Sequence, residues 1–118
     1  MKFTITGELP RLNDYINAER RNKFIAAKIK KEATENVSWQ VKKLQKITDP
    51  GLYTFTWYVK NLRTDPDNIS FGQKFIFDGL QTANKLVNDN MKMVLGLDHR
   101  FVVDAKNPRV EVEVTPYE

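Results

Sequence analysis

Alternation of apolar and polar residues marks the extended parts of the chain, because successive side chains of a strand point to opposite faces. Phe3 and Ile5 alternate with threonines over residues 2–6. Residues 52–60 place Tyr53, Phe55, Trp57 and Val59 on one face, an aromatic stripe that is more typical of a core than of a base-stacking platform. Residues 100–104 and 110–114 alternate around the turn at 106–108 and predict a terminal hairpin.

Two other stretches repeat apolar residues every three or four positions, which predicts helices over about 18–47 and 72–87. Asn13 or Asp14 could cap a helix entry before the first, and a short further turn is expected over 91–97. The expected buried stripes are Ile25, Ile29, Ala33, Val37, Val41 and Leu44 in the first helix, and Ile76, Leu80, Ala83 and Val87 in the second.

The resulting order is strand, helix, strand, helix, strand, strand. It predicts an α+β fold, with one domain over 1–118 and a small mixed sheet packed against two helices. No apolar run approaches the roughly 20 residues needed to span a bilayer, so we expect no membrane partner. No leader peptide is expected at Met1. The chain has no cysteine, which suits a reducing cytosol.

Charge is distributed unevenly along the chain. Residues 1–47 carry 11 Lys and Arg against 5 Asp and Glu, whereas residues 48–118 carry 8 against 10. A basic half beside clustered acids fits a polyanion binder with a metal site. The alternative is a solvated basic helix on a cytosolic protein.

The candidate chemistry lies in residues 63–90. Pro66 keeps Asp65 out of the helical region, so Asp65 and Asp67 are expected on an extended turn. A helix of about 24 Å would follow, and a chain that turns back could return Asp89 to the first pair. We therefore expect Asp65, Asp67, Asp89 and Lys74 to gather at one site.

Three carboxylates would suit Mg²⁺, which prefers oxygen ligands and keeps several waters. Such an ion can activate water and neutralise charge on a phosphodiester, while Lys74 could hold a phosphate oxygen. Simpler readings stay open. The Asp-Pro-Asp-Asn sequence is also a common helix-capping turn, and Lys74 with Asp78 could be an ordinary i,i+4 ion pair.

The sequence excludes three other kinds of site. An EF-hand loop starting at Asp65 needs Gly at its sixth position and Glu at its twelfth, but Ser70 and Ile76 stand there. No Gly-x4-Gly-Lys run exists, which excludes a P-loop. His99 is the one histidine, so a multi-histidine zinc site within one chain is excluded. We interpret His99 as a surface residue.

Three segments together resemble the RusA family of Holliday-junction resolvases. They are Asp65-Pro66-Asp67-Asn68, the Lys74-to-Leu80 run with Asp78, and Asn88-Asp89-Asn90. The N-terminal Pro10-Arg11-Leu12-Asn13-Asp14-Tyr15 also resembles a loop of that family. The expected order of strands and helices also agrees with that of the RusA family over almost the whole chain. The gap between Asn68 and Lys74 is longer than in the family pattern, and only Lys60 and Arg63 precede the acidic pair.

The resemblance implies a small homodimer that binds four-way DNA junctions and uses Mg²⁺ or Mn²⁺, without a small-molecule cofactor, to nick two symmetry-related strands. It would act in the cytoplasm of a bacterial or phage-infected cell. The implied catalytic and metal residues are Asp65, Asp67 and Asp89, with Lys74 as catalytic lysine. The implied DNA-contacting residues are Arg11, Asn13, Tyr15, Lys60, Arg63 and Asn68, and we expect the basic helix start with Arg20 and Arg21 to add to them.

On this basis we hypothesise in-line attack of metal-bound water on a phosphodiester. A closed two-fold dimer would present two identical sites to two equivalent strands of a junction. The alternative is a non-catalytic DNA-binding or recombination-accessory protein on the same fold. A structural module that does not bind polyanions is a third reading, and salt-insensitive binding would favour it.

Overall fold

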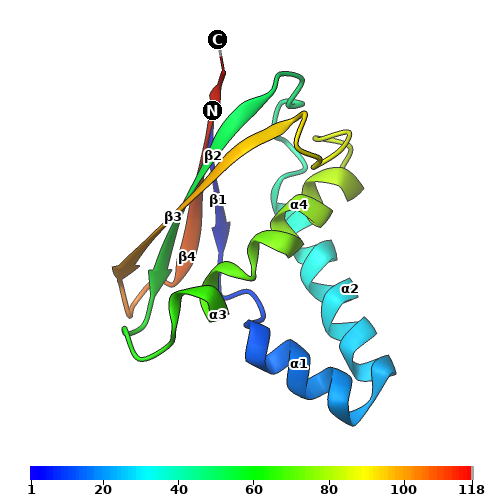
Figure 1. Cartoon of the computed structure of the whole chain (residues 1–118), viewed down its shortest axis with the longest axis vertical. Coiled ribbons are helices and arrows are strands. Elements are labelled where there is room, and N and C mark those ends of the chain that lie inside the picture. Colours follow the sequence, from blue (N-terminus) through cyan, green and yellow to red (C-terminus); the bar gives the residue numbers. More distant parts are fainter. Residues whose placement is uncertain (118) are drawn as a thin grey trace.

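The computed structural model describes residues 1–117, which form a four-stranded sheet and four helices (Figure 1). The elements in chain order are β1 (Lys2–Thr6), α1 (Leu12–Arg21), α2 (Lys23–Gln40), β2 (Gly51–Val59), α3 (Pro66–Ser70), α4 (Gln73–Thr82), β3 (Val94–Val103) and β4 (Arg109–Pro116). The expected α+β class, strand order along the chain and mixed sheet are confirmed. The first expected helix is divided into α1 and α2, the second corresponds to α4, and α3 lies where an extended turn was expected.

The sheet has the order β1-β4-β2-β3, with β2 and β3 parallel and the other neighbours antiparallel. The expected hairpin of the last two strands is therefore wrong, because β2 lies between β3 and β4. The Asp104 N–H still donates to the Val59 carbonyl, so residues 104–108 pass the end of β2 before β4 begins. Alternation of apolar and polar residues indicates which face of the sheet each side chain lies on. It does not indicate which strand lies next to it in the sheet.

The first expected helix breaks at Asn22. Its backbone is extended, and its side-chain oxygen accepts from the Phe24 N–H, so Asn22 caps α2. Arg11 is the N-cap residue of α1, and its N–H donates to Asp14. The break changes the buried stripe: Ala26, Ala33 and Val37 are buried, whereas Ile25 is 43% exposed. Helix α2 ends at Gln40, short of the expected Ile47.

The second expected helix is also shorter, because α4 ends at Thr82 rather than near residue 87. Asn84 follows with a φ of 59°, a left-handed conformation that stops a helix. Leu86 then forms a bridge with Ile47 and is buried, while Val87 is exposed. Strand β3 begins at Val94 rather than at Arg100 and takes up most of the turn expected over 91–97.

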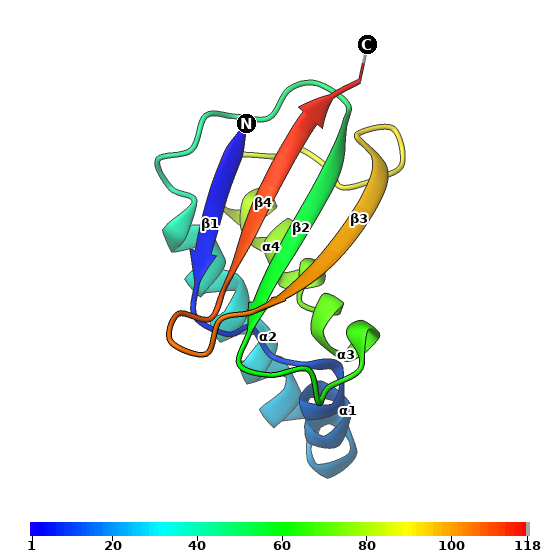
Figure 2. The same ribbon diagram turned by 90° about the vertical axis from the view of Figure 1, so that its left-hand side faces the viewer.

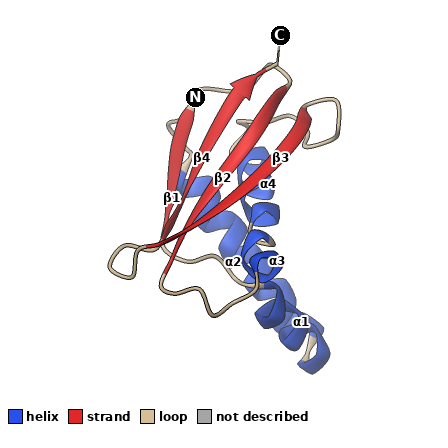
Figure 3. Ribbon diagram, turned by 60° about the vertical axis from the view of Figure 1, so that its left-hand side comes forward, coloured by secondary structure: helices blue, strands red, loops and turns tan. Residues whose placement is uncertain are grey.

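Helices α2 and α4 cover one face of the sheet and leave the other face open (Figures 2 and 3). The core lies between these layers. It includes the expected β2 stripe, the valines of β4, and Phe75, Ile76 and Leu80 of α4. Gly79 faces Val37 so closely that a Cβ there would overlap the valine side chain. Within residues 1–117, no helix is both long and apolar enough to cross a membrane.

Candidate functional site

The acidic turn, Asp65-Pro66-Asp67-Asn68, lies where the loop after β2 enters α3. Asp65 is the N-cap residue of α3 and has extended backbone angles (φ −65°, ψ 147°), as Pro66 requires. Asp67 lies in the first turn of α3 rather than on an extended segment, which corrects the expectation for that residue. Both residues are exposed. In the described part of the chain, no hydrogen bond or ion pair engages either carboxylate.

Asn68 connects this turn to the N-terminal segment. It is 9% exposed, and its side-chain oxygen accepts the Asn13 N–H at 2.8 Å. Arg11 adds a second link by donating from Nη1 to Thr64 Oγ1 at 3.1 Å. Two segments more than 50 residues apart in sequence therefore meet directly. The burial of Asn68 favours a positioning role over the DNA contact expected for it.

Aromatic packing holds the same junction between the two segments. The half-buried Tyr15 ring of α1 lies 5.7 Å from Phe71 and 6.5 Å from Phe75, measured between ring centroids. Such contacts fix the start of α1 against the segment joining α3 and α4. Arg11 is likewise half-buried, whereas Asn13 exposes its side chain to solvent.

Lys74 lies in the first turn of α4 and pairs with Asp78, one turn further on. The Lys74 Nζ to Asp78 Oδ2 distance is 3.7 Å, so the i,i+4 pair left open by the sequence exists. Asp78 Oδ2 is buried and, within residues 1–117, accepts no hydrogen bond. Lys74 thus neutralises this carboxylate, and its 44% exposed side chain also lies open to solvent.

Asp89 lies in the connection between α4 and β3, residues 83–93. Figure 1 shows this connection at the opposite end of α4 from α3. Among residues 1–117, no three Asp, Glu, His or Cys side chains come close enough to hold a metal ion together. The structure therefore does not bring Asp89 back to Asp65 and Asp67 within one chain, because the connection that carries Asp89 lies at the end of α4 away from α3 and leads on into β3.

The basic residues expected to contact DNA divide into two groups. Arg63 is exposed in the loop just before the acidic turn, and Lys60 pairs with Glu8 at 3.8 Å in the same region. Arg20 and Arg21 occupy the last turn of α1, which leads away from α3 (Figure 1). Cations at that end also interact favourably with the helix dipole, so they have a structural explanation of their own.

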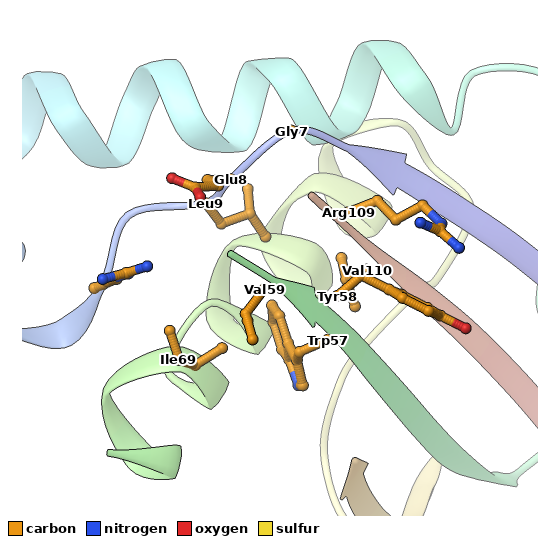
Figure 4. A pocket seen from close by; sticks show the side chains of 10 residues that line it. Gly7, Glu8, Leu9, Trp57, Tyr58, Val59, Ile69, Arg109 and Val110 are labelled. Atoms are coloured by element: carbon orange, nitrogen blue, oxygen red, sulfur yellow. The ribbon is translucent and has the colours of Figure 1, made fainter. Parts of the chain in front are cut away.

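A small pocket lies beside the acidic turn, between residues 7–11, the end of β2 and α3 (Figure 4). Ile69 of α3 and Trp57 of β2 line it, and Arg109 stacks over Tyr58 at 3.7 Å nearby. Its volume is about 30 Å³, close to that of one water molecule. It is therefore a packing gap beside the site rather than a nucleotide pocket.

His99 was expected at the surface, and the structure corrects this. The half-buried imidazole accepts the Trp57 Nε1–H at its Nδ1 (2.9 Å), and its Nε2 lies 3.2 Å from Gln73 Oε1. Burial lowers the pKa of His99, against a smaller opposing effect of Asp98. Sequence reasoning missed this link because its partners lie on β2 and α4, with no local spacing to reveal them.

Comparisons with models of known protein families and with curated proteins find no match. The geometry of the chain itself must therefore carry the functional argument.

Proposed function

We propose that this protein is a divalent-metal-dependent endonuclease that resolves four-way DNA junctions. One observation supports the proposal most strongly. Two of the four segments that carry the resemblance to RusA-type resolvases, residues 10–15 and 65–68, are joined in space through Asn13 and Asn68. The joint leaves the Asp65 and Asp67 carboxylates exposed and without protein partners among residues 1–117.

The exposed pair fits a hard divalent cation. Mg²⁺ is commonly held by one or two carboxylates and completes its octahedron with water and phosphate oxygens, so Asp65 and Asp67 suffice as protein ligands. Mn²⁺ would suit the same oxygen donors. A cation held there would activate water and neutralise charge on a phosphodiester.

The remaining residues bind and orient the DNA backbone. Arg63 and Arg11 flank the acidic turn and supply contacts to phosphates, which position a nucleic acid without reading its sequence. Lys74 reaches solvent in the first turn of α4, and exchanging its contact with Asp78 for a phosphate oxygen would stabilise developing negative charge. Asn68 keeps the acidic turn attached to α1.

Junction resolution requires two cuts, so the proposal includes a homodimer with one acidic turn in each subunit. A two-fold dimer matches the approximate two-fold symmetry of a four-way junction. A single chain carries one such turn and would only nick.

The test is cleavage of a labelled four-way junction beside a matched linear duplex, with Mg²⁺ or with EDTA. We expect paired symmetric nicks in the junction with Mg²⁺ alone. Asp67→Asn should retain binding and lose at least about 100-fold in rate, on the scale of losing a group that stabilises transition-state charge. Asp49→Asn, an exposed aspartate before β2, is the matched control and should cut normally.

Normal cleavage by Asp67→Asn would refute the site. Metal-independent binding with no cleavage by any variant would instead favour the accessory DNA-binding protein, whose basic surface has no catalytic task.

A further inference from the structure

Strand β3 forms an open edge of the sheet (Figure 2). Within residues 1–117 it pairs with β2 alone, so its outer row of backbone N–H and C=O groups has no strand partner. The strand is ten residues long and contains no proline. Proteins usually shorten, bend or cover such an edge, because it is a template for pairing with another chain.

Both faces of β3 carry exposed apolar side chains. On the face toward the helices, Leu97 and Val103 are 49% and 50% exposed, on either side of His99, which contacts Gln73 of α4, and on the open face Val102 is 43% exposed. On the open face, Asp98 and Arg100 form an exposed ion pair at 3.2 Å. An apolar strip thus flanks a self-complementary pair of charges along one edge.

We propose that a second copy of this chain pairs with β3 in antiparallel fashion, about a two-fold axis at His99. In this register Asp98 faces Arg100 of the partner subunit, and Arg100 faces the partner subunit's Asp98. Opposite charges directly across strands stabilise a sheet and like charges destabilise it. An axis at Asp98 or Arg100 would place like charges opposite each other, so the charges select the axis at His99.

The apolar residues agree with the same register. Leu97 would face Phe101 of the partner subunit. Each of these side chains lies on the helix-facing side of the sheet, where the exposed strip would then be covered. A two-fold axis makes every contact occur twice, which closes the assembly at two copies and leaves no β3 edge open.

The pairing also affects the acidic turn. Antiparallel strands place the start of one β3 beside the end of the other, and the end of β3 lies beside Val59, which leads into the acidic turn. The partner's residues 83–93 would therefore approach the end of the sheet that carries Asp65. This consequence rests on the proposed function, whereas the interface itself does not.

Two single variants and their mixture test the interface by sedimentation. Asp98→Arg places arginines opposite arginines, and Arg100→Asp places aspartates opposite aspartates. Each variant alone should dimerise at least about tenfold more weakly than wild type, because like charges facing across an interface are costly. Mixed together they restore opposite charges and should form heterodimers of about twice the 13.8 kDa chain mass.

Glu113→Lys is the matched control, since Glu113 is an exposed open-face residue on β4, away from β3. It should dimerise as wild type does, and far-ultraviolet circular dichroism should show all variants folded. A monomeric wild type, or variants that dimerise alone as well as in the mixture, would overturn the proposal. Because the readout is mass, a catalytically silent dimer through β3 would refute the proposed activity and leave this interface standing.

Discussion

At the scale of single residues, His99 shows how one side chain joins three elements. The Trp57 indole N–H can donate only to an imidazole nitrogen that carries no proton. Neutral His99 therefore carries its one ring proton on Nε2, which donates to Gln73 Oε1. Protonation of Nδ1 would break the bond to Trp57. This cost disfavours the charged imidazole, as burial does, and burial lowers the pKa of His99.

This arrangement predicts a stability that falls in mild acid. Because the folded pKa lies below the unfolded value near 6.5, the unfolded chain binds more protons as pH falls through that value. The stabilising effect is therefore complete above about pH 6.5 and is lost below it. Urea unfolding at pH 7.5 and 5.5 should show a lower midpoint at the acid pH.

His99→Phe provides the control, since the chain has no other histidine. The variant should lose this part of the pH dependence. A wild-type midpoint that is constant or rises toward pH 5.5 would contradict the network.

Asn68 is the residue on which the geometry of the acidic turn depends. Asn68→Ala removes the acceptor of the partly buried Asn13 N–H bond and should lower the free energy of unfolding by about 1–2 kcal/mol. Asn13→Ala keeps the backbone donor and should change stability by less than about 0.5 kcal/mol. Chemical denaturation of both variants measures the difference, and equal losses would show that this bond is not what holds the turn.

At the scale of elements, the close contact between α2 and α4 depends on Gly79. A Cβ there would overlap Val37, so Gly79→Ala should destabilise the fold by about 1–3 kcal/mol through overpacking. Thr82→Ala, exposed on the same helix, should have little effect. The double variant Gly79→Ala with Val37→Ala should lose less than the sum of the single losses. Additive losses in thermal unfolding would show that the two residues are not in conflict.

The elements also show what a sequence can and cannot specify. The stripe Tyr53, Phe55, Trp57 and Val59 was predicted correctly because a face alternates locally along β2. The predicted hairpin of the last two strands is wrong because the packing of the whole sheet determines which strands are neighbours, and β2 lies between β3 and β4. The helix break at Asn22 is a capping signal, and the expected helix extended across it because no Gly or Pro interrupts residues 18–47.

In the candidate site, too, local features could be predicted from the sequence and long-range contacts could not. The extended backbone of Asp65 before Pro66 is local and was predicted correctly, whereas Asp67 lies in the first turn of α3. The bond between Asn13 and Asn68 is long-range, and no local pattern in the sequence predicts it. The position of Asp89 depended on where α4 ends, and Asn84 ends it earlier than the apolar pattern suggested.

At the scale of the whole molecule, α3 and the start of α1 lie at one end of the sheet, and the rest of α1 extends beyond it (Figure 1). Arg11 caps the start of α1, and Arg63 precedes α3 in the chain. Binding through phosphates releases counterions, so junction affinity should fall steeply as salt rises. Arg63→Ala should weaken binding to all sequences alike and reduce the slope of log affinity against log salt by about one.

Fluorescence anisotropy over a range of salt concentrations measures this slope. Lys92→Ala, in the connection on the far side of α4, is a control with an exposed lysine and should leave the slope unchanged. Affinity that does not depend on salt would favour the structural-module reading.

The most direct test of the account is cleavage of a supercoiled plasmid that extrudes a cruciform, with Mg²⁺ present. Two coordinated cuts across the junction linearise the plasmid, whereas isolated cuts give only nicked circles. A junction-resolving dimer should give linear product from the wild type, none with EDTA, and none from Asp67→Asn. Absence of any product with Mg²⁺ or Mn²⁺, or equal cleavage of a relaxed plasmid without the cruciform, would contradict it.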